Sequence, residues 1–180
     1  MLIADQYVDT ILMMVEFATK DMQTIMQGCS TLPYSDTHKA LAAENSVNRI
    51  LITKTQAAGY VVGQAISLSA SAYHLDELAK NRTITAITDK STEETYLYFD
   101  GAAVNIAVGN FVSSRPWVNG ATDVVAASSG SPTDNTSGKY PCKYRGKENP
   151  YGNAWVNVAD LLAVRKGSED NYTYHMAYLP

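Results

Sequence analysis

Histidines are the residues in this 180-residue chain whose side chains most readily bind metals or transfer protons. His38, His74 and His175 share no metal-ligand spacing with one another or with cysteines. Cys29 and Cys142 are the two cysteines, and we expect free buried thiols there, with a disulfide between them as the alternative. The sequence therefore predicts isolated loop or surface histidines, no metal site and no cofactor.

Adjacent carboxylates are the other candidates for chemistry, at Asp76–Glu77, Glu93–Glu94 and Glu169–Asp170. Each pair stands in a polar stretch, which is typical of a solvated turn. A glycosidase needs two carboxyl groups roughly 5–10 Å apart, but the fold sets that separation and no spacing selects a pair here. Neither a serine nucleophile elbow nor a phosphate-binding glycine loop occurs. We therefore expect no enzyme, with a glycan hydrolase as a weaker alternative.

Tyrosine is abundant, with 12 residues against 3 Phe and 2 Trp. A tyrosine ring offers apolar area and one hydroxyl at low entropic cost, which suits contact surfaces. The alternative is that these rings fill a loop-rich, weakly apolar core. The candidate binding residues, all in polar surroundings, are Tyr140, Tyr144, Tyr151, Tyr172 and Tyr174.

A long amphipathic helix is predicted over residues 3–27. Apolar residues recur there at three- and four-residue spacing, and Gly28 is placed to end the helix. Such a helix of about 25 residues would be a rod of about 37 Å. It either packs across a sheet or forms a bundle with copies of itself.

Short strands are predicted between residues 46 and 112. Apolar alternation indicates strands at 47–53, 60–69, 83–88, 95–99, 104–108 and 110–112. A turn is expected at 56–59, a short helical or loop excursion at 70–81, and a hairpin around Asp89–Lys90–Ser91. Several short strands at close spacing favour a small barrel or sandwich-like unit.

From Ser113 to Asn153 the chain is rich in Ser, Gly, Asn, Thr and Pro, with aromatic residues spaced through it. Long loops of this kind inside a compact domain are usually functional. After Trp155 a strand-like pattern resumes, with Val156, Val158, Leu161 and Val164.

The net charge of −4 and pI near 5.3 disfavour a nucleic-acid partner, whose phosphates would demand a basic face. No stretch approaches the roughly 18 apolar residues needed to span a bilayer. Asp5 and Asp9 stand where a signal peptide would carry positive charge. We expect a protein made in the cytoplasm without membrane insertion.

The most specific stretch runs from Gly138 to Trp155 and contains R-G-K-E-N-P-Y-G-N-A-W. This core resembles tail and minor structural proteins of phages and prophages, and its G-N-x-W element resembles C-type-lectin-like domains of the formylglycine-generating-enzyme kind. Phage tropism proteins belong to that broad fold group. Further similar stretches are Glu16–Thr19, Gln23–Gly28, Ala43–Ile50, Val62–Ser67 and Phe99–Asn110.

The resemblance has departures. Many relatives carry a further aromatic residue and Asp-Gly after the tryptophan, where this chain reads Val156 to Asp160. Related lectin-like proteins often continue beyond the equivalent of Pro180, and their variable ligand-facing surface lies in that continuation. The catalytic cysteine pair of the formylglycine-generating enzymes is not matched, because Cys142 stands alone before the G-N-x-W element.

Physical chemistry gives the same motif a structural reading. Glycine permits sharp turns, proline fixes one of them, and asparagine side chains bond loop backbone. The tryptophan would bury its ring, and Arg145 with Glu148 would form a partly buried ion pair. The residues assigned this structural role are Arg145, Gly146, Glu148, Asn149, Pro150, Gly152, Asn153 and Trp155.

The sequence thus predicts an α+β fold: a long N-terminal helix, a small β-barrel-like insertion at 46–112, and a C-type-lectin-like, loop-rich domain made of 1–45 plus 113–180. The resemblance implies a bacteriophage virion structural protein, a tail, attachment or decoration element in the receptor-binding class. Expected partners are further copies of the chain in a homo-oligomer such as a trimer, other virion proteins, and a host-surface glycan or protein. A carbohydrate-binding module is the main alternative.

Overall fold

The computed structural model describes residues 3–25, 36–117, 120, 139–141, 143–150, 161–167 and 172–178. Two compact units make up the chain. Unit 1 comprises Met1–Met22 and Trp155–Pro180, and unit 2 comprises Gln23–Ala154. The sequence prediction placed the boundaries instead at residues 45/46 and 112/113.

The helix of unit 1, α1, spans Ile3–Phe17. It ends because Ala18 takes a left-handed conformation (φ 51°), after which the Thr19 side chain accepts a hydrogen bond from Asp21 N at 3.1 Å. A short 3-10 helix, η1, follows at Met22–Thr24. The predicted continuous helix is therefore wrong for residues 18–25, and its last two residues lie outside the described residues.

Unit 1 also contains a hairpin of β10 (Leu161–Gly167) and β11 (Tyr172–Tyr178). The two strands pair antiparallel along their whole length, from Leu161 opposite Tyr178 to Gly167 opposite Tyr172. The predicted strand around Leu161–Val164 is confirmed, whereas Val156 and Val158 lie outside the described residues.

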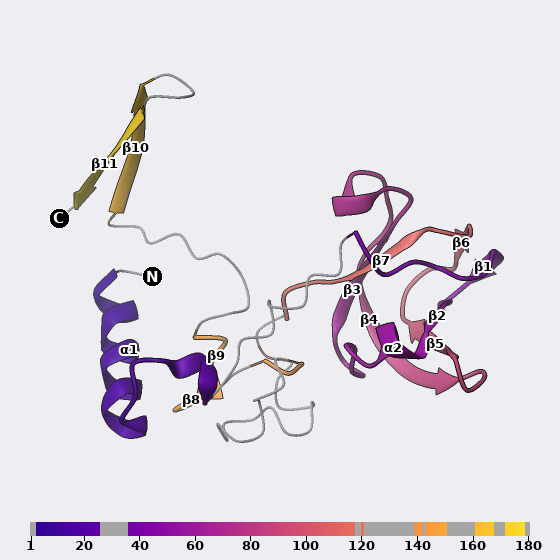
Figure 1. The fold of residues 1–180 in the computed structure, drawn as a ribbon, viewed down its shortest axis with the longest axis horizontal. Helices are drawn as coiled ribbons and strands as arrows, with labels where there is room; N and C mark the ends of the chain where they lie inside the picture. Colours follow the sequence, from indigo (N-terminus) through magenta and orange to yellow (C-terminus); the bar gives the residue numbers. More distant parts are fainter. Residues whose placement is uncertain are drawn as a thin grey trace. The chain divides into compact units, whose positions relative to one another are not determined.

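Unit 2 is built on a five-stranded antiparallel sheet with the strand order β2-β5-β4-β3-β7 (Figure 1). Its longest strand, β4, pairs through its first half with β3 and through its second half with β5, so β4 joins both parts of the sheet. The strand bounds are β2 Arg49–Thr53, β3 Ala65–Ser69, β4 Glu77–Asp89, β5 Glu94–Phe99 and β7 Phe111–Ser114.

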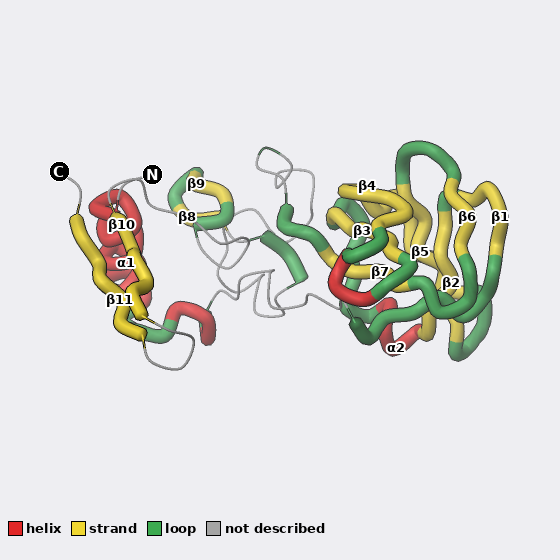
Figure 2. Tube along the Cα trace, turned by 90° about the horizontal axis from the view of Figure 1, so that it is seen from above, coloured by secondary structure: helices red, strands yellow, loops and turns green. Residues whose placement is uncertain are grey.

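The described residues of unit 2 also contain smaller elements. Strand β1 (Glu44–Val47) pairs with β6 (Val104–Ile106), and these two run beside the main sheet (Figure 2). Strands β8 (Lys143–Tyr144) and β9 (Lys147–Glu148) form a short hairpin. The helices are α2 (Lys54–Ala57) and the 3-10 turn η3 (Ala72–His74).

Residues 38–41 connect the two outer strands of the main sheet. Ala40 N donates to Asn110 O at 2.7 Å, and Val112 N donates to His38 O at 3.0 Å, so this segment runs along β7. Leu41 N then donates to Leu51 O of β2 at 2.9 Å. Both edges of the sheet therefore find backbone partners in one short segment.

The core lies on one face of this sheet. Alternate residues point inward, as strand geometry requires, so Ile50, Ile52, Ile66 and Leu68 are fully buried. Each such side chain contributes roughly 1.5–3 kcal/mol by leaving water. The remaining members of the core cluster are Ala40, Ala57, Tyr60, Ala79, Ile84, Leu97, Phe99, Ile106 and Val112.

The described residues contain both helices and antiparallel strands, which confirms a mixed α+β fold. The hairpin around Asp89–Lys90–Ser91 is confirmed as β4–β5. The turn expected at 56–59 is found at residues 58–59. Residues 56 and 57 belong instead to the one-turn helix α2, which begins where Thr53 and Gln56 form a reciprocal capping box. None of the helices within the described ranges is long and apolar enough to cross a membrane.

Candidate contact surface

Three serines mark the outer face of the sheet at β3 and β7. Ser67 and Ser69 alternate with the inward-facing Ile66 and Leu68, and Ser67 lies opposite Ser113 of β7. All three serines are nevertheless buried. The outer face is covered here, at Ser67 by the Arg115 side chain and at Ser69 and Ser113 by the loop that follows β3.

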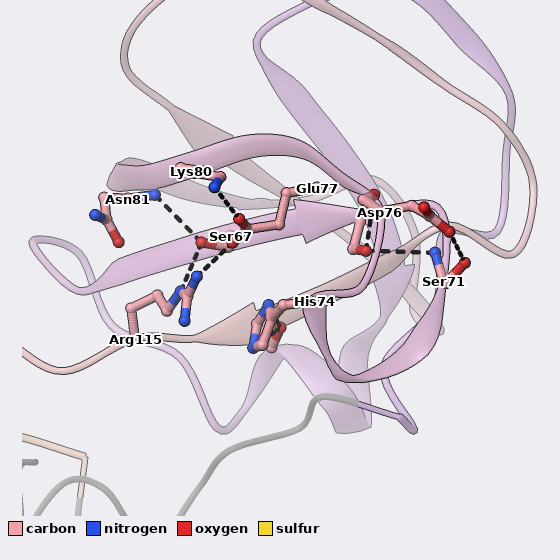
Figure 3. Close-up of polar contacts among 10 residues, drawn as sticks. Ser67, Ser71, His74, Asp76, Glu77, Lys80, Asn81 and Arg115 are labelled. Atoms are coloured by element: carbon pink, nitrogen blue, oxygen red, sulfur yellow. Dashed lines mark hydrogen bonds and ion pairs between the residues drawn. The ribbon is translucent and has the colours of Figure 1, made fainter. Parts of the chain in front are cut away.

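We name this loop the Tyr73 loop and define it as residues 70–76. Its two ends are tied together, since Ala70 N donates to Asp76 O at 2.8 Å and Ser69 Oγ donates to the same carbonyl at 2.9 Å. Ser71 Oγ donates to the Asp76 carboxylate, as Figure 3 shows. Three short polar side chains therefore hold the base of the loop shut.

The tip of the loop is strained. Tyr73 (φ 57°) and His74 (φ 60°) both adopt the left-handed region, which costs side-chain-bearing residues roughly 1–2 kcal/mol each. The Tyr73 hydroxyl donates to Asp36 Oδ2 at 2.7 Å, and this bond raises the pKa of Tyr73. Consecutive strained residues persist only where surrounding contacts fix them, and they are often found at functional sites.

A charged cluster lies beside the loop on the same outer face (Figure 3). Glu77 forms ion pairs with Arg115 of the β7 end and with Lys80, the latter at 2.8 Å. Arg115 Nε also donates to Ser67 Oγ at 2.8 Å. The bond from Lys80, together with Arg115, lowers the pKa of Glu77, so this carboxylate is ionised at neutral pH.

His74 turns inward from the loop toward Ser113. The Ser113 oxygen lies 3.2 Å from both ring nitrogens, so it is aligned with neither. Burial, reinforced by Arg115, lowers the pKa of His74, which keeps the ring neutral at pH 7. A serine nucleophile needs one aligned base nitrogen and access to substrate, and Ser113 is buried. This pair is therefore suited to holding the loop on the sheet.

Two large apolar side chains of the loop face solvent. Tyr73 is 63% exposed and Leu75 is 78% exposed, and Leu78 at the start of β4 is also exposed. A tyrosine and a leucine held outward on a rigid, hydrogen-bonded loop provide contact area with little conformational entropy left to lose. The arrangement is suited to binding another macromolecule.

The tyrosines predicted to bind lie elsewhere. Tyr140 packs against the buried Trp117 together with Val61, and Tyr144 is 5% exposed. Tyr172 and Tyr174 occupy β11, opposite Gly167 and Arg165. Tyr151 lies outside the described residues. For Tyr140 and Tyr144 the structure favours the packing alternative over a contact role.

The described part of the R-G-K-E-N-P-Y-G-N-A-W stretch contains a turn. Arg145 (φ 48°) and Gly146 (φ 81°) are the two central residues of the β8–β9 hairpin, both left-handed as a type I′ turn requires. The expected turn at Gly146 is thus confirmed. Arg145 lies over the Tyr144 ring at 5.5 Å, and Glu148 accepts a hydrogen bond from Gly120 N. Asn149 is left-handed and Pro150 is buried, while Gly152, Asn153 and Trp155 lie outside the described residues.

Of the two predicted positions for histidines, loop or surface, His38 occupies a loop position. His38 is buried, with Nδ1 3.1 Å from the Tyr60 hydroxyl, so it is not a surface histidine. Asp76 is exposed as expected for a solvated turn, but the side chain of Glu77 is only 9% exposed. Within the described ranges no group of three or more His, Cys, Asp or Glu side chains is placed to hold a metal ion.

Sequence reasoning missed the Tyr73 loop and its charged cluster. The pattern Ser69–Ala70–Ser71 before Asp76 was the available signal, because serines and aspartates close loops by bonding nearby backbone. The pairing of Glu77 with Arg115 spans 38 residues and leaves no local pattern. No protein-family model, curated protein or solved structure matches the chain.

Proposed function

We propose that this chain is a structural component of a bacteriophage particle, an attachment or decoration element, and that it contacts another protein through the Tyr73 loop. The observation that carries the contact role is the exposure of Tyr73 and Leu75 on a strained loop that three polar side chains hold shut. The particle assignment rests on the sequence resemblance of the R-G-K-E-N-P-Y-G-N-A-W stretch.

We further propose that the five-stranded sheet of unit 2 closes into a small β-barrel that carries the Tyr73 loop. Residues 38–41 bond to β7 on one side and to β2 on the other, which supports closure of the five-stranded sheet. Closure leaves no free sheet edge and fixes the outer face on which the loop is mounted. A rigid mount keeps the loop in one conformation for its partner.

Mass spectrometry of purified particles tests the location, and site-specific photocrosslinking tests the contact. A photoreactive amino acid replaces Leu75 in one variant and Thr92, an exposed residue of the β4–β5 turn, in a matched control. We expect the chain in washed particles and a specific adduct from position 75 only.

Absence of the chain from particles contradicts the particle assignment. Equal adducts from positions 75 and 92 contradict the role of the loop. A Leu75→Asp variant gives a third readout, because a buried unpaired carboxylate weakens an apolar contact. We expect its incorporation into particles to fall at least tenfold while its thermal unfolding is unchanged.

A further inference from the structure

One titratable side chain of the Tyr73 loop, His74, lies against the sheet. Its half-buried ring contacts Ser113, which is 1% exposed. The backbone of His74 is also strained, because its φ of 60° lies in the left-handed region. That strain is relieved when the loop tip leaves the sheet, so the contact between the neutral ring and Ser113 helps to hold the tip in place.

The charges around the His74 ring are already out of balance. Arg115 at the end of β7 and Glu77 at the start of β4 act on the ring, and Figure 3 shows all three side chains on the same face of the sheet. The Glu77 carboxylate pairs with both Arg115 and Lys80. A proton on His74 would therefore add a third positive charge around one carboxylate.

The other carboxylates at the loop bond other partners. Asp76 accepts a hydrogen bond from Ser71 Oγ, and Asp36 accepts one from the Tyr73 hydroxyl. Both aspartates are exposed, so water screens their charges. The third neighbouring strand, β3, contributes uncharged serines to this face.

Protonation also changes the hydrogen bonds that the His74 ring needs. A neutral imidazole has one donor and one acceptor nitrogen, whereas the protonated ring has two donors. Among the described residues, the acceptor within reach is Ser113 Oγ, which lies 3.2 Å from both nitrogens and is aligned with neither. The closed loop thus holds a neutral ring better than a charged one, which water would solvate in an open loop.

We propose that the Tyr73 loop is a pH-sensitive switch, in which protonation of His74 releases the loop tip from the sheet and removes the contact surface of Tyr73 and Leu75. Burial, followed by Arg115, lowers the pKa of His74 from 6.5 in the closed loop, so the open loop binds the proton more tightly. The closed form is therefore fully favoured above pH 6.5 and is destabilised as the pH falls through the lowered pKa. This regulation rests on the function proposed above, but the movement of the loop can be measured without a partner.

NMR spectroscopy of the full chain between pH 7.5 and pH 5 tests the switch. The ring C–H signals of His74 report its protonation, and the backbone amide signals of Tyr73 and Leu75 report the conformation of the tip. We expect both sets of signals to change with one midpoint below pH 6.5. The ratio of closed to open loop should fall by a factor of about three or more over this range.

Three variants separate His74 from the other groups that titrate. His74→Gln carries a neutral amide, and its tip signals should stay constant down to pH 5. His38→Asn removes the other histidine in this unit and should leave the transition in place. Arg115→Gln removes a positive charge beside the ring, so the midpoint should rise toward pH 6.5. Tip signals that change in His74→Gln as in the natural chain, or that stay constant while His74 titrates, overturn the proposal.

Photocrosslinking from position 75 at pH 7.5 and at pH 5 distinguishes the switch from the proposed contact. Adducts at pH 7.5 that disappear at pH 5 support both. A tip that opens in the NMR titration but gives no adduct at either pH contradicts the contact and leaves the movement of the loop established. Equal adducts at both pH values overturn the switch.

Discussion

The Nδ1 atom of His38 lies 3.1 Å from the hydroxyl oxygen of Tyr60 in the core of unit 2. Since that hydroxyl donates its own hydrogen to Val112 O at 3.2 Å, the ring nitrogen is the donor, and His38 is the neutral tautomer with its proton on Nδ1. His38 also begins the segment that joins β7 to β2. One neutral imidazole therefore secures the backbone link between the two sheet edges.

Acidification should weaken this link. Burial lowers the pKa of His38 from 6.5 to about 4, so the unfolded chain binds the proton more readily than the folded chain. The stability is fully present above pH 6.5 and is lost as the pH falls toward 4. We expect a loss of about 2 kcal/mol between pH 7 and pH 5, measured by urea unfolding.

His38→Asn is the matched variant, since its amide can donate to Tyr60 but does not titrate. We expect most of the stability loss between pH 7 and pH 5 to disappear. A small part should remain because the pKa of His74 is also lowered. Glu77 and Asp89 titrate below this window, because their pKa values are lowered from 4.5 and 3.8. An unchanged pH profile would show that His38 is not the titrating group.

Removing the Glu77 charge should lower the stability of the charged cluster beside the Tyr73 loop. Glu77→Gln leaves Arg115 without its carboxylate partner in a largely buried position, and we expect a loss of about 2 kcal/mol. Lys80→Gln removes the other partner, which is largely exposed, and should cost less than about 1 kcal/mol. Chemical denaturation of both variants measures the difference, and equal losses would contradict the dominance of the Arg115 pair.

Periodicity and turn chemistry predicted the parts of the fold that depend on neighbouring residues. Ile66 and Leu68 alternate with serines, and the polar Asp89–Ser91 stretch separates two alternating runs, so β3 and the β4–β5 hairpin follow from the sequence. The stop of α1 at Phe17 does not, because apolar spacing continues through Met22 while Ala18 leaves the helical conformation.

The contact surface depends on contacts between residues far apart in the sequence. Glu77 accepts a hydrogen bond from Arg115, which is 38 residues away in the sequence, and the Tyr73 hydroxyl donates to Asp36, which is 37 residues away. A tyrosine-rich composition suggested a contact surface, but composition does not say which rings the fold leaves exposed. Tyr144 is buried and Tyr73 is exposed, although both stand in polar surroundings.

Gly101 should resist substitution for two separate reasons. Its φ is +84°, and an added Cβ would lie 1.5 Å from Nη1 of Arg82. Gly109 has nearly the same φ of +85° but no atom within 4 Å of such a Cβ. Each alanine variant pays backbone strain of about 1 kcal/mol, and displacing the Arg82 guanidinium should add about 1 kcal/mol at Gly101 only. Thermal unfolding of the two variants should separate them, and equal losses would show that Arg82 moves aside freely.

Tyr140 offers a direct choice between a packing role and a contact role. Its ring packs against Trp117, which is 4% exposed, so Tyr140→Ala should open that site to water and cost roughly 3 kcal/mol. In a Trp155→Phe background Trp117 is the one remaining tryptophan, and its fluorescence should shift to longer wavelength. Tyr140→Phe keeps the ring and should leave the spectrum unchanged. If Tyr140→Ala changes neither stability nor fluorescence, the ring does not support Trp117. That outcome would favour the contact role predicted from the sequence.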